Sequence, residues 1–149
     1  MSVHEIFPYL CVRDASAAVA FYERAFGATE LFRLVEPDGL VGHVEIQLGA
    51  HVVMLCDASP KYGTRAPDEG ERLTFVLHLH VDDADALVAR AVAAGASLVS
   101  PVADHFYGER SGRVRDPFGY VWLIGHSLEK LSPAEMQRRY TALCSPEPS

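Results

Sequence analysis

The chain has 149 residues, of which 49% are hydrophobic and 22% are charged, a composition able to bury the core of one globular domain. Its formal net charge is −7 and no run of lysines and arginines occurs, which argues against a nucleic-acid or anionic-membrane surface. The three cysteines have no metal-type spacing, and no signal peptide or transmembrane run is visible. We therefore expect a reduced, cytoplasmic protein.

The first 56 residues follow the pattern of a strand, a helix and three more strands. Residues 6–12 form the first predicted strand. Asp14 offers an N-cap for the helix, and Gly27 is placed to end it as a C′ residue. The later strands are expected at residues 29–35, 41–48 and 51–56.

Residues 57–72 have a different character, with two prolines, two glycines and many charges but no apolar period. The segment is longer than most connections between secondary-structure elements. We expect a plain surface connector, and a functional lid is the alternative.

The same pattern then restarts. A strand is expected at residues 73–81, followed by a helix that Asp82 or Asp83 caps and Gly95 closes. A DPFG turn at residues 116–119 precedes the final strand, because proline and glycine supply the dihedral angles of a tight reversal. The remaining strands are expected at residues 97–102, 111–115 and 120–124.

Three pairs of positions match between the two halves at offsets of 69, 68 and 70 residues, which predicts an internal duplication of a βαβββ unit. The pairs are Val12 with Val81, Gly27 with Gly95, and Gly49 with Gly119. We therefore expect one domain over residues 1–126 and a helical tail over residues 127–149. The domain divides into repeats at residues 6–56 and 73–126, joined by the linker at residues 57–72.

The tail carries a capping box at residues 132–135, with proline at the first helical position. Met136, Tyr140 and Leu143 form an apolar stripe on the helix that follows. We expect this stripe to dock on the body of the protein; a dimer contact is the alternative.

Two βαβββ units, the DPFG turn and the preceding Tyr-Gly-Glu-Arg segment at residues 107–110 together resemble the vicinal oxygen chelate superfamily. Its members include glyoxalase I, bleomycin-resistance proteins, fosfomycin-resistance enzymes and extradiol dioxygenases. The resemblance covers residues 6–126, and residues 107–119 look most like the bleomycin-resistance and PhnB-like branches. It implies an α+β fold in which paired units form a curved mixed sheet around a ligand cup, and a homodimer.

The metal enzymes of that superfamily place a His or Glu on four strands that face the cup. Counted on this sequence, those positions fall on Phe7, Val53, Val76 and Leu123. None of these side chains offers the nitrogen, oxygen or thiolate donor that a divalent cation needs. The resemblance therefore implies a cup without a metal or other cofactor.

Side chains two residues apart on a strand share a face, so neighbours of those four positions should also face the cup. His51 lies two before Val53, His78 two after Val76, and Tyr9 two after Phe7. The predicted ligand-binding set is Phe7, Tyr9, His51, Val53, Val76, His78, Tyr107, Arg113 and Leu123.

Other polar and aromatic residues are candidates for the cup or are expected outside it. Glu45 and Arg115 are further polar candidates, whereas Trp122 has the opposite parity to Leu123 and should pack under the helices. Surface or loop positions are expected for His4, His43, His105 and His126.

These features favour a metal-independent protein that binds a small molecule with a flat face, such as an antibiotic. A second hypothesis is a lyase or isomerase with His51 or His78 as general base and Tyr9 as proton donor. A third is a metal-dependent glyoxalase or dioxygenase, against which the four apolar positions argue. The identity of the ligand and whether a reaction occurs stay open.

Overall fold

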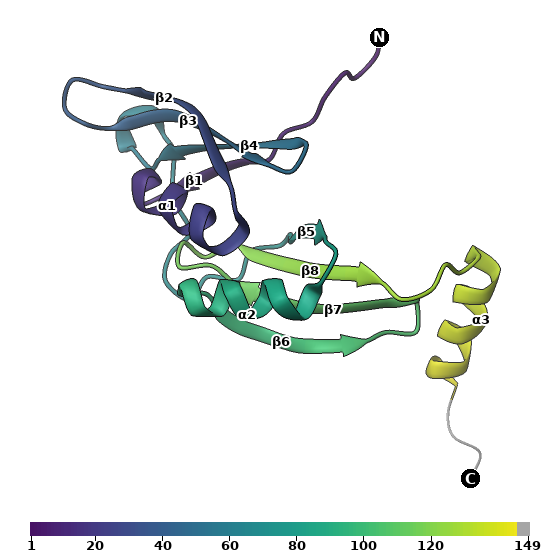
Figure 1. Ribbon diagram of the computed structural model, residues 1–149. Helices are drawn as coiled ribbons and strands as arrows, with labels where there is room; N and C mark the ends of the chain where they lie inside the picture. The colour runs from purple at the N-terminus through teal and green to yellow at the C-terminus, as the bar shows by residue number, and fades with distance from the viewer. Residues whose placement is uncertain (146–149) are drawn as a thin grey trace.

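The computed structural model describes residues 1–145 and shows an α+β fold built from two similar units (Figure 1). The first unit consists of strand β1 (Tyr9–Val12), helix α1 (Ala15–Phe26) and strands β2 (Thr29–Val35), β3 (Val41–Leu48) and β4 (His51–Asp57). The second unit consists of strand β5 (Leu77–His80), helix α2 (Ala84–Ala94) and strands β6 (Ser97–Asp104), β7 (Glu109–Arg115) and β8 (Val121–Ser127). A short 3-10 turn, η1 (Pro60–Tyr62), lies in the connector, and helix α3 (Pro133–Cys144) follows the second unit.

Each unit contains one four-stranded mixed sheet, and the two sheets have the same topology. Their strand orders are β1-β4-β3-β2 and β5-β8-β7-β6. The first pair in each sheet is parallel and the other two pairs are antiparallel. The predicted pair of βαβββ repeats is therefore confirmed.

The duplication extends to the way each helix begins. The side chain of Asp57 accepts a 2.6 Å hydrogen bond from the backbone N–H of Ala15, the first residue of α1. In the second unit, Nδ1 of His126 accepts a 2.9 Å bond from the N–H of Ala84, the first residue of α2. The last strand of each unit thus caps its own helix. His126, expected on the surface or in a loop, lies in β8 and has this structural role.

The strands β1 and β5 are shorter than the sequence predicts. β1 begins at Tyr9 instead of residue 6, and β5 at Leu77 instead of residue 73. Both are edge strands that pair with a single neighbour. The end of such a strand depends on where the pairing with its neighbour stops. The apolar pattern of the strand does not indicate that position.

The two units are joined through their helices and through a contact between Tyr22 and Trp122. Helix α1 packs against α2, and the guanidinium group of Arg90 donates a 2.7 Å hydrogen bond to the carbonyl oxygen of Arg24 near the end of α1. Tyr22 of α1 also contacts Trp122 of β8, with ring centroids 5.4 Å apart. Trp122 is 1% exposed, as its predicted position under the helices requires.

The tail docks on the body through an aromatic contact and through a 3.2 Å hydrogen bond that Arg139 donates to the carbonyl oxygen of Phe106. Helix α3 lies beyond the end of the second sheet (Figure 1). The ring of Tyr140 stacks on Phe106 at 5.4 Å, whereas Leu143 from the same predicted stripe is 65% exposed. Among residues 1–145, no helix combines the length and the apolar character needed to cross a membrane.

Candidate functional site

Each sheet has one face covered by a helix and one face that we call the open face. Strand β3 shows the division, because Val44 and Ile46 are fully buried on the helix side while His43 and Glu45 alternate with them. The pairing of β3 with β4 and of β4 with β1 brings Glu45, Met54 and Tyr9 into line across the open face of the first sheet.

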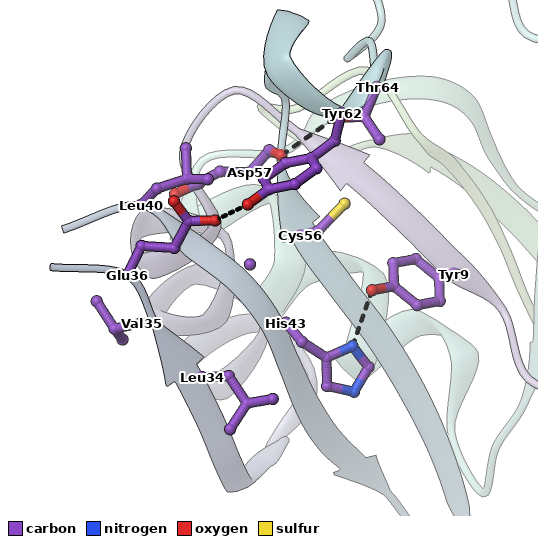
Figure 2. Close-up of a pocket in the computed structure, with 11 residues that line it drawn as sticks. Tyr9, Leu34, Val35, Glu36, Leu40, His43, Cys56, Asp57, Tyr62 and Thr64 are labelled. Carbon is purple, nitrogen blue, oxygen red and sulfur yellow. Dashed lines mark hydrogen bonds between the residues drawn. The ribbon is translucent and has the colours of Figure 1, made fainter. Parts of the chain in front are cut away.

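A cavity of about 490 Å³ lies at one end of this open face (Figure 2). It is formed by the ends of β2, β3 and β4, the β2–β3 turn, β1 and the start of the connector. Its lining residues are Tyr9, Leu34, Val35, Glu36, Leu40, Gly42, His43, Cys56, Asp57, Tyr62 and Thr64. The cavity has the size of a small-molecule site and combines aliphatic walls with a few polar groups.

A chain of three hydrogen-bonded side chains crosses this part of the sheet. The hydroxyl group of Tyr9 lies 2.8 Å from Nδ1 of His43, and Figure 2 shows the two side chains pointing toward each other. The other ring nitrogen of His43, Nε2, lies 3.1 Å from a carboxylate oxygen of Glu45. Burial is the main cause that raises the pKa of Tyr9, and the nearby Cys56 thiol adds to it, so the phenol stays protonated at neutral pH.

The connector contributes directly to the cavity. The hydroxyl group of Tyr62 donates a hydrogen bond to Glu36 at the β2–β3 turn, and Nζ of Lys61 lies 3.0 Å from the same carboxylate. These two contacts lower the pKa of Glu36, the bond from Tyr62 being the larger cause. The connector is therefore anchored at the end of the cavity, where the turn η1 presents Tyr62.

The orientation predicted for Val53 and His51 requires a correction. Val53 pairs with Ile46 and is 5% exposed on the helix-covered face, and His51 pairs with Leu48 on that side of β4. The prediction matched Gly49 with Gly119, but the β3–β4 loop has two residues and the β7–β8 loop has five. A shift of one residue reverses the facing of every side chain on a strand.

The strand pairing identifies the true counterpart of Leu123. Leu123 pairs with His78 across the parallel strands β8 and β5, and Tyr9 pairs with Met54 across β4 and β1. Because Tyr9 and His78 occupy equivalent positions in the two repeats, Met54 is the residue of the first unit that corresponds to Leu123.

Four of the predicted site residues meet in a second hollow, separate from the first cavity. Phe7, His51, Val53 and His78 all line a crevice of about 630 Å³ to which both units contribute. Tyr9 lines the first cavity instead. The predicted residues Val76, Tyr107, Arg113 and Leu123 line neither of these two hollows.

The open face of the second sheet carries a separate polar group. Nε2 of His80 lies 3.2 Å from a carboxylate oxygen of Glu109, and Nε2 of His78 lies 4.0 Å from the other oxygen. Arg113 extends exposed from the same face. Tyr107 stacks on His105 with ring centroids 5.1 Å apart, and Val76 precedes β5 and is 42% exposed.

Residues 3–124 match the profile of the Glyoxalase/Bleomycin resistance protein/Dioxygenase superfamily. The chain belongs to this superfamily. An uncharacterized protein of Mycobacterium bovis is 37% identical over 133 residues, which cover 87% of this chain and 88% of that protein.

Solved structures of this superfamily's fold are similar as well. TioX from Micromonospora sp. ML1 has 28% identity and a TM-score of 0.66, with 85% of this chain and all of that chain covered. An Arabidopsis thaliana gene product has 32% identity and a TM-score of 0.64, with 83% and 98% covered. The closer assignment to a PhnB-like branch stays a prediction.

The residues at the superfamily's metal positions do not fit a metal ion. With the corrected pairing, these positions are Phe7, Met54, Val76 and Leu123, whose side chains offer three hydrocarbon groups and one thioether. Divalent metals of this kind require imidazole, carboxylate or thiolate ligands. In the part of the chain that the structure describes, no group of three His, Cys, Asp or Glu residues is arranged to hold a metal elsewhere.

The sequence prediction missed His43, which was assigned to the surface or a loop, and it gave no role to Glu36, Cys56 or Tyr62. A signal for His43 was present in β3, where His43, Glu45 and Gln47 alternate with apolar residues and so mark one face. Tyr62 had no such signal, because only the folded connector brings it to the cavity.

Proposed function

We propose that this protein binds a small, largely apolar molecule without a metal, in the cavity on the open face of the first sheet. The observation that carries the proposal is the cavity of about 490 Å³, which Leu34, Val35 and Leu40 line together with the hydrogen-bonded Tyr9–His43 pair. Apolar walls supply binding energy, and a few fixed polar groups orient the ligand.

The proposal excludes a metal on the ground of donor chemistry. The four superfamily positions carry no ligand atom that a divalent cation binds strongly, and Met54 offers only a thioether. Binding must then depend on shape, apolar burial and hydrogen bonds, with Tyr9 and His43 as the central polar contacts.

We further propose a homodimer in which a second copy covers the open face. Tyr9 and Leu34 line the cavity, and Phe32 contacts His43 beside it. These three side chains (Tyr9, Leu34 and Phe32) are 52%, 60% and 45% exposed in the single chain. Large apolar side chains gathered on one exposed face commonly mark an interface, and a curved sheet with an uncovered face leaves such a surface. The second copy and the small molecule are the partners we expect.

The binding proposal is tested by a ligand-observed NMR screen of small aromatic compounds against protein treated with EDTA. Gly42 lines the cavity at a bulge in β3, and a Cβ atom there would meet only the carbonyl oxygen of Leu34, at 3.9 Å. Gly42→Leu should therefore fill the cavity and abolish binding of the hits, while the matched control Gly42→Ala retains it. Hits that bind equally to Gly42→Leu, or that require an added divalent metal, would refute the proposal.

A further inference from the structure

The Tyr9–His43–Glu45 chain has a defined set of donors and acceptors. An ionised Glu45 carboxylate can only accept hydrogen bonds, so Nε2 of His43, 3.1 Å away, must carry a proton. A neutral imidazole has a single N–H group, which leaves Nδ1 as an acceptor. The hydroxyl group of Tyr9, 2.8 Å from Nδ1, therefore donates its only proton to His43.

This arrangement leaves the lone pairs of the Tyr9 oxygen as acceptors in the cavity. Tyr9 is half exposed and lines the cavity, so a ligand can reach that oxygen. A ligand group that donates to Tyr9 continues the chain of hydrogen bonds, whereas a pure acceptor finds no proton there. The cavity therefore selects a ligand with an O–H or N–H group at this point.

The groups around His43 come from three neighbouring strands. Glu45 lies beside it on β3, and the groups facing it from β1 and β4 are Tyr9 and the thiols of Cys11 and Cys56. Strand β2 contributes an apolar contact, the ring of Phe32 at 5.7 Å. The charged residues that line the cavity are Glu36 and Asp57, and no lysine or arginine is among the lining residues. Both carboxylates already accept hydrogen bonds, Glu36 from Tyr62 and Asp57 from two backbone N–H groups.

The thiol of Cys56 is not a proton acceptor. Burial is the largest cause that raises the pKa of Cys56, to about 11, so this group stays an S–H at neutral pH. Nδ1 of His43 is then the acceptor nitrogen of the Tyr9–His43–Glu45 chain.

We propose that Tyr9, His43 and Glu45 form a proton-accepting relay that binds a phenol as its phenolate. The proton of the phenolic O–H passes to the oxygen of Tyr9, while the proton of Tyr9 passes to Nδ1 of His43. The net change is one phenol and one neutral imidazole converted to one phenolate and one imidazolium. The phenolate then accepts a hydrogen bond from Tyr9, and Glu45 compensates the charge on His43.

A phenol suits the rest of the cavity. Its flat ring can lie against Leu34, Val35 and Leu40, and its hydroxyl group is the acidic donor that the Tyr9 oxygen requires. This inference rests on the proposed binding function and names the ligand class for the same site.

The experiment uses 4-nitrophenol, whose phenolate absorbs visible light and whose neutral form does not. At a mildly acidic pH the free probe is mainly neutral, so a phenolate band that appears on adding the protein reports the bound anion. His43→Gln and Tyr9→Phe should lose this band. Glu45→Gln, which keeps the size of the side chain, should reduce the bound phenolate fraction about tenfold because it removes a charge-assisted hydrogen bond. Tyr140→Phe on α3 is the matched control and should behave as the unmodified chain.

Calorimetric titration with the same probe separates the outcomes. Binding of 4-nitrophenol without a phenolate band, or a band that persists in His43→Gln, would overturn the relay and leave the binding proposal intact. Failure of the probe to bind would overturn the assignment to phenols, while the NMR screen decides the binding function independently. Circular dichroism of each variant checks the fold. If His43→Gln does not fold, the smaller phenolate band expected of Glu45→Gln still tests the relay.

Discussion

The hydroxyl group of Tyr22 on α1 donates a 2.6 Å hydrogen bond to the buried carboxylate of Asp116, which lies 94 residues further along the chain in the β7–β8 turn. The same carboxylate accepts a 2.9 Å bond from Nε1 of Trp122 and two bonds from backbone N–H groups of the turn, those of Phe118 and Tyr120. The Asp116 side chain therefore stabilises the DPFG turn of the second unit and links that unit to helix α1 of the first.

Replacing Asp116 with alanine should strongly destabilise the protein. The change leaves the buried donors of Tyr22 and Trp122 without a partner, and each such group costs about 1–3 kcal/mol. We expect a loss of about 3 kcal/mol or more in the free energy of unfolding, measured by chemical denaturation. Asp82→Ala is the control, because Asp82 is exposed, and it should change stability by less than about 0.5 kcal/mol.

Asp116 should also give the protein a pH-dependent stability of unusual sign for a carboxylate. Burial is the largest influence on Asp116 and raises its pKa above the ordinary value, although four hydrogen bonds oppose the change. The native state therefore retains this proton to a higher pH than the unfolded chain does. The resulting stabilisation is complete below the unfolded pKa of about 3.9 and is lost as the pH rises through the folded pKa.

The pH effect is measured against Asp116→Asn, which cannot titrate. Denaturation curves at several mildly acidic pH values should show the unmodified chain losing stability relative to the variant as the pH rises. An opposite slope would mean that the hydrogen bonds outweigh burial.

The hydrogen bonds that Asp57 and His126 accept from the first residues of α1 and α2 should contribute differently to stability. Asp57 accepts bonds from the backbone N–H groups of both Ala15 and Val41, at 2.6 and 2.7 Å, whereas His126 accepts one, from Ala84. Asp57→Ala should therefore cost about 2–3 kcal/mol and His126→Ala about 1 kcal/mol. Thermal and chemical unfolding of both variants checks the order; equal losses would contradict it.

Gly108 should be intolerant of any side chain. Its φ angle is +83°, and a Cβ atom there would lie 2.7 Å from the carbonyl oxygen of Glu129, at the start of the tail. Gly108→Ala should destabilise the protein by more than Gly63→Ala, whose φ is also positive but whose Cβ would meet nothing within 4 Å. Gly63→Ala measures the backbone strain alone, about 1–2 kcal/mol. The additional loss of stability in Gly108→Ala measures the steric clash with Glu129.

The proposed dimer should depend on the open face of the first sheet. Light scattering is expected to give about twice the chain mass of 16.3 kDa, and Leu34→Asp should return the mass to that of one chain. Leu143→Asp makes the same change on α3, at a residue that is 65% exposed, and should leave the dimer intact. A monomer produced only by Leu143→Asp would assign the interface to α3 instead.

The sequence by itself determined the elements whose signals are local. Asp14 caps the first helix as expected, and Asp83 is the one of the two candidates, Asp82 and Asp83, that caps the second. Gly27 and Gly95 end these helices as expected. These signals are local, because a capping group contacts residues only a few positions away. The repeat also followed from the sequence, since two copies of one pattern lie in the same chain. The burial of Trp122 followed from parity within a single strand.

Only the tertiary structure decided which faces and which distant residues come together. The facing of β4 depends on its register with β3, and a shift of one residue in the match between the repeats separates Val53, which lies in the core, from Met54, which lies on the open face. The contact between Tyr9 and His43 joins positions 34 residues apart through two strand pairings, and Tyr62 reaches Glu36 through a folded connector. Hydrogen bonds between strands are set by register, which is a property of pairs of segments and cannot be read from either segment alone.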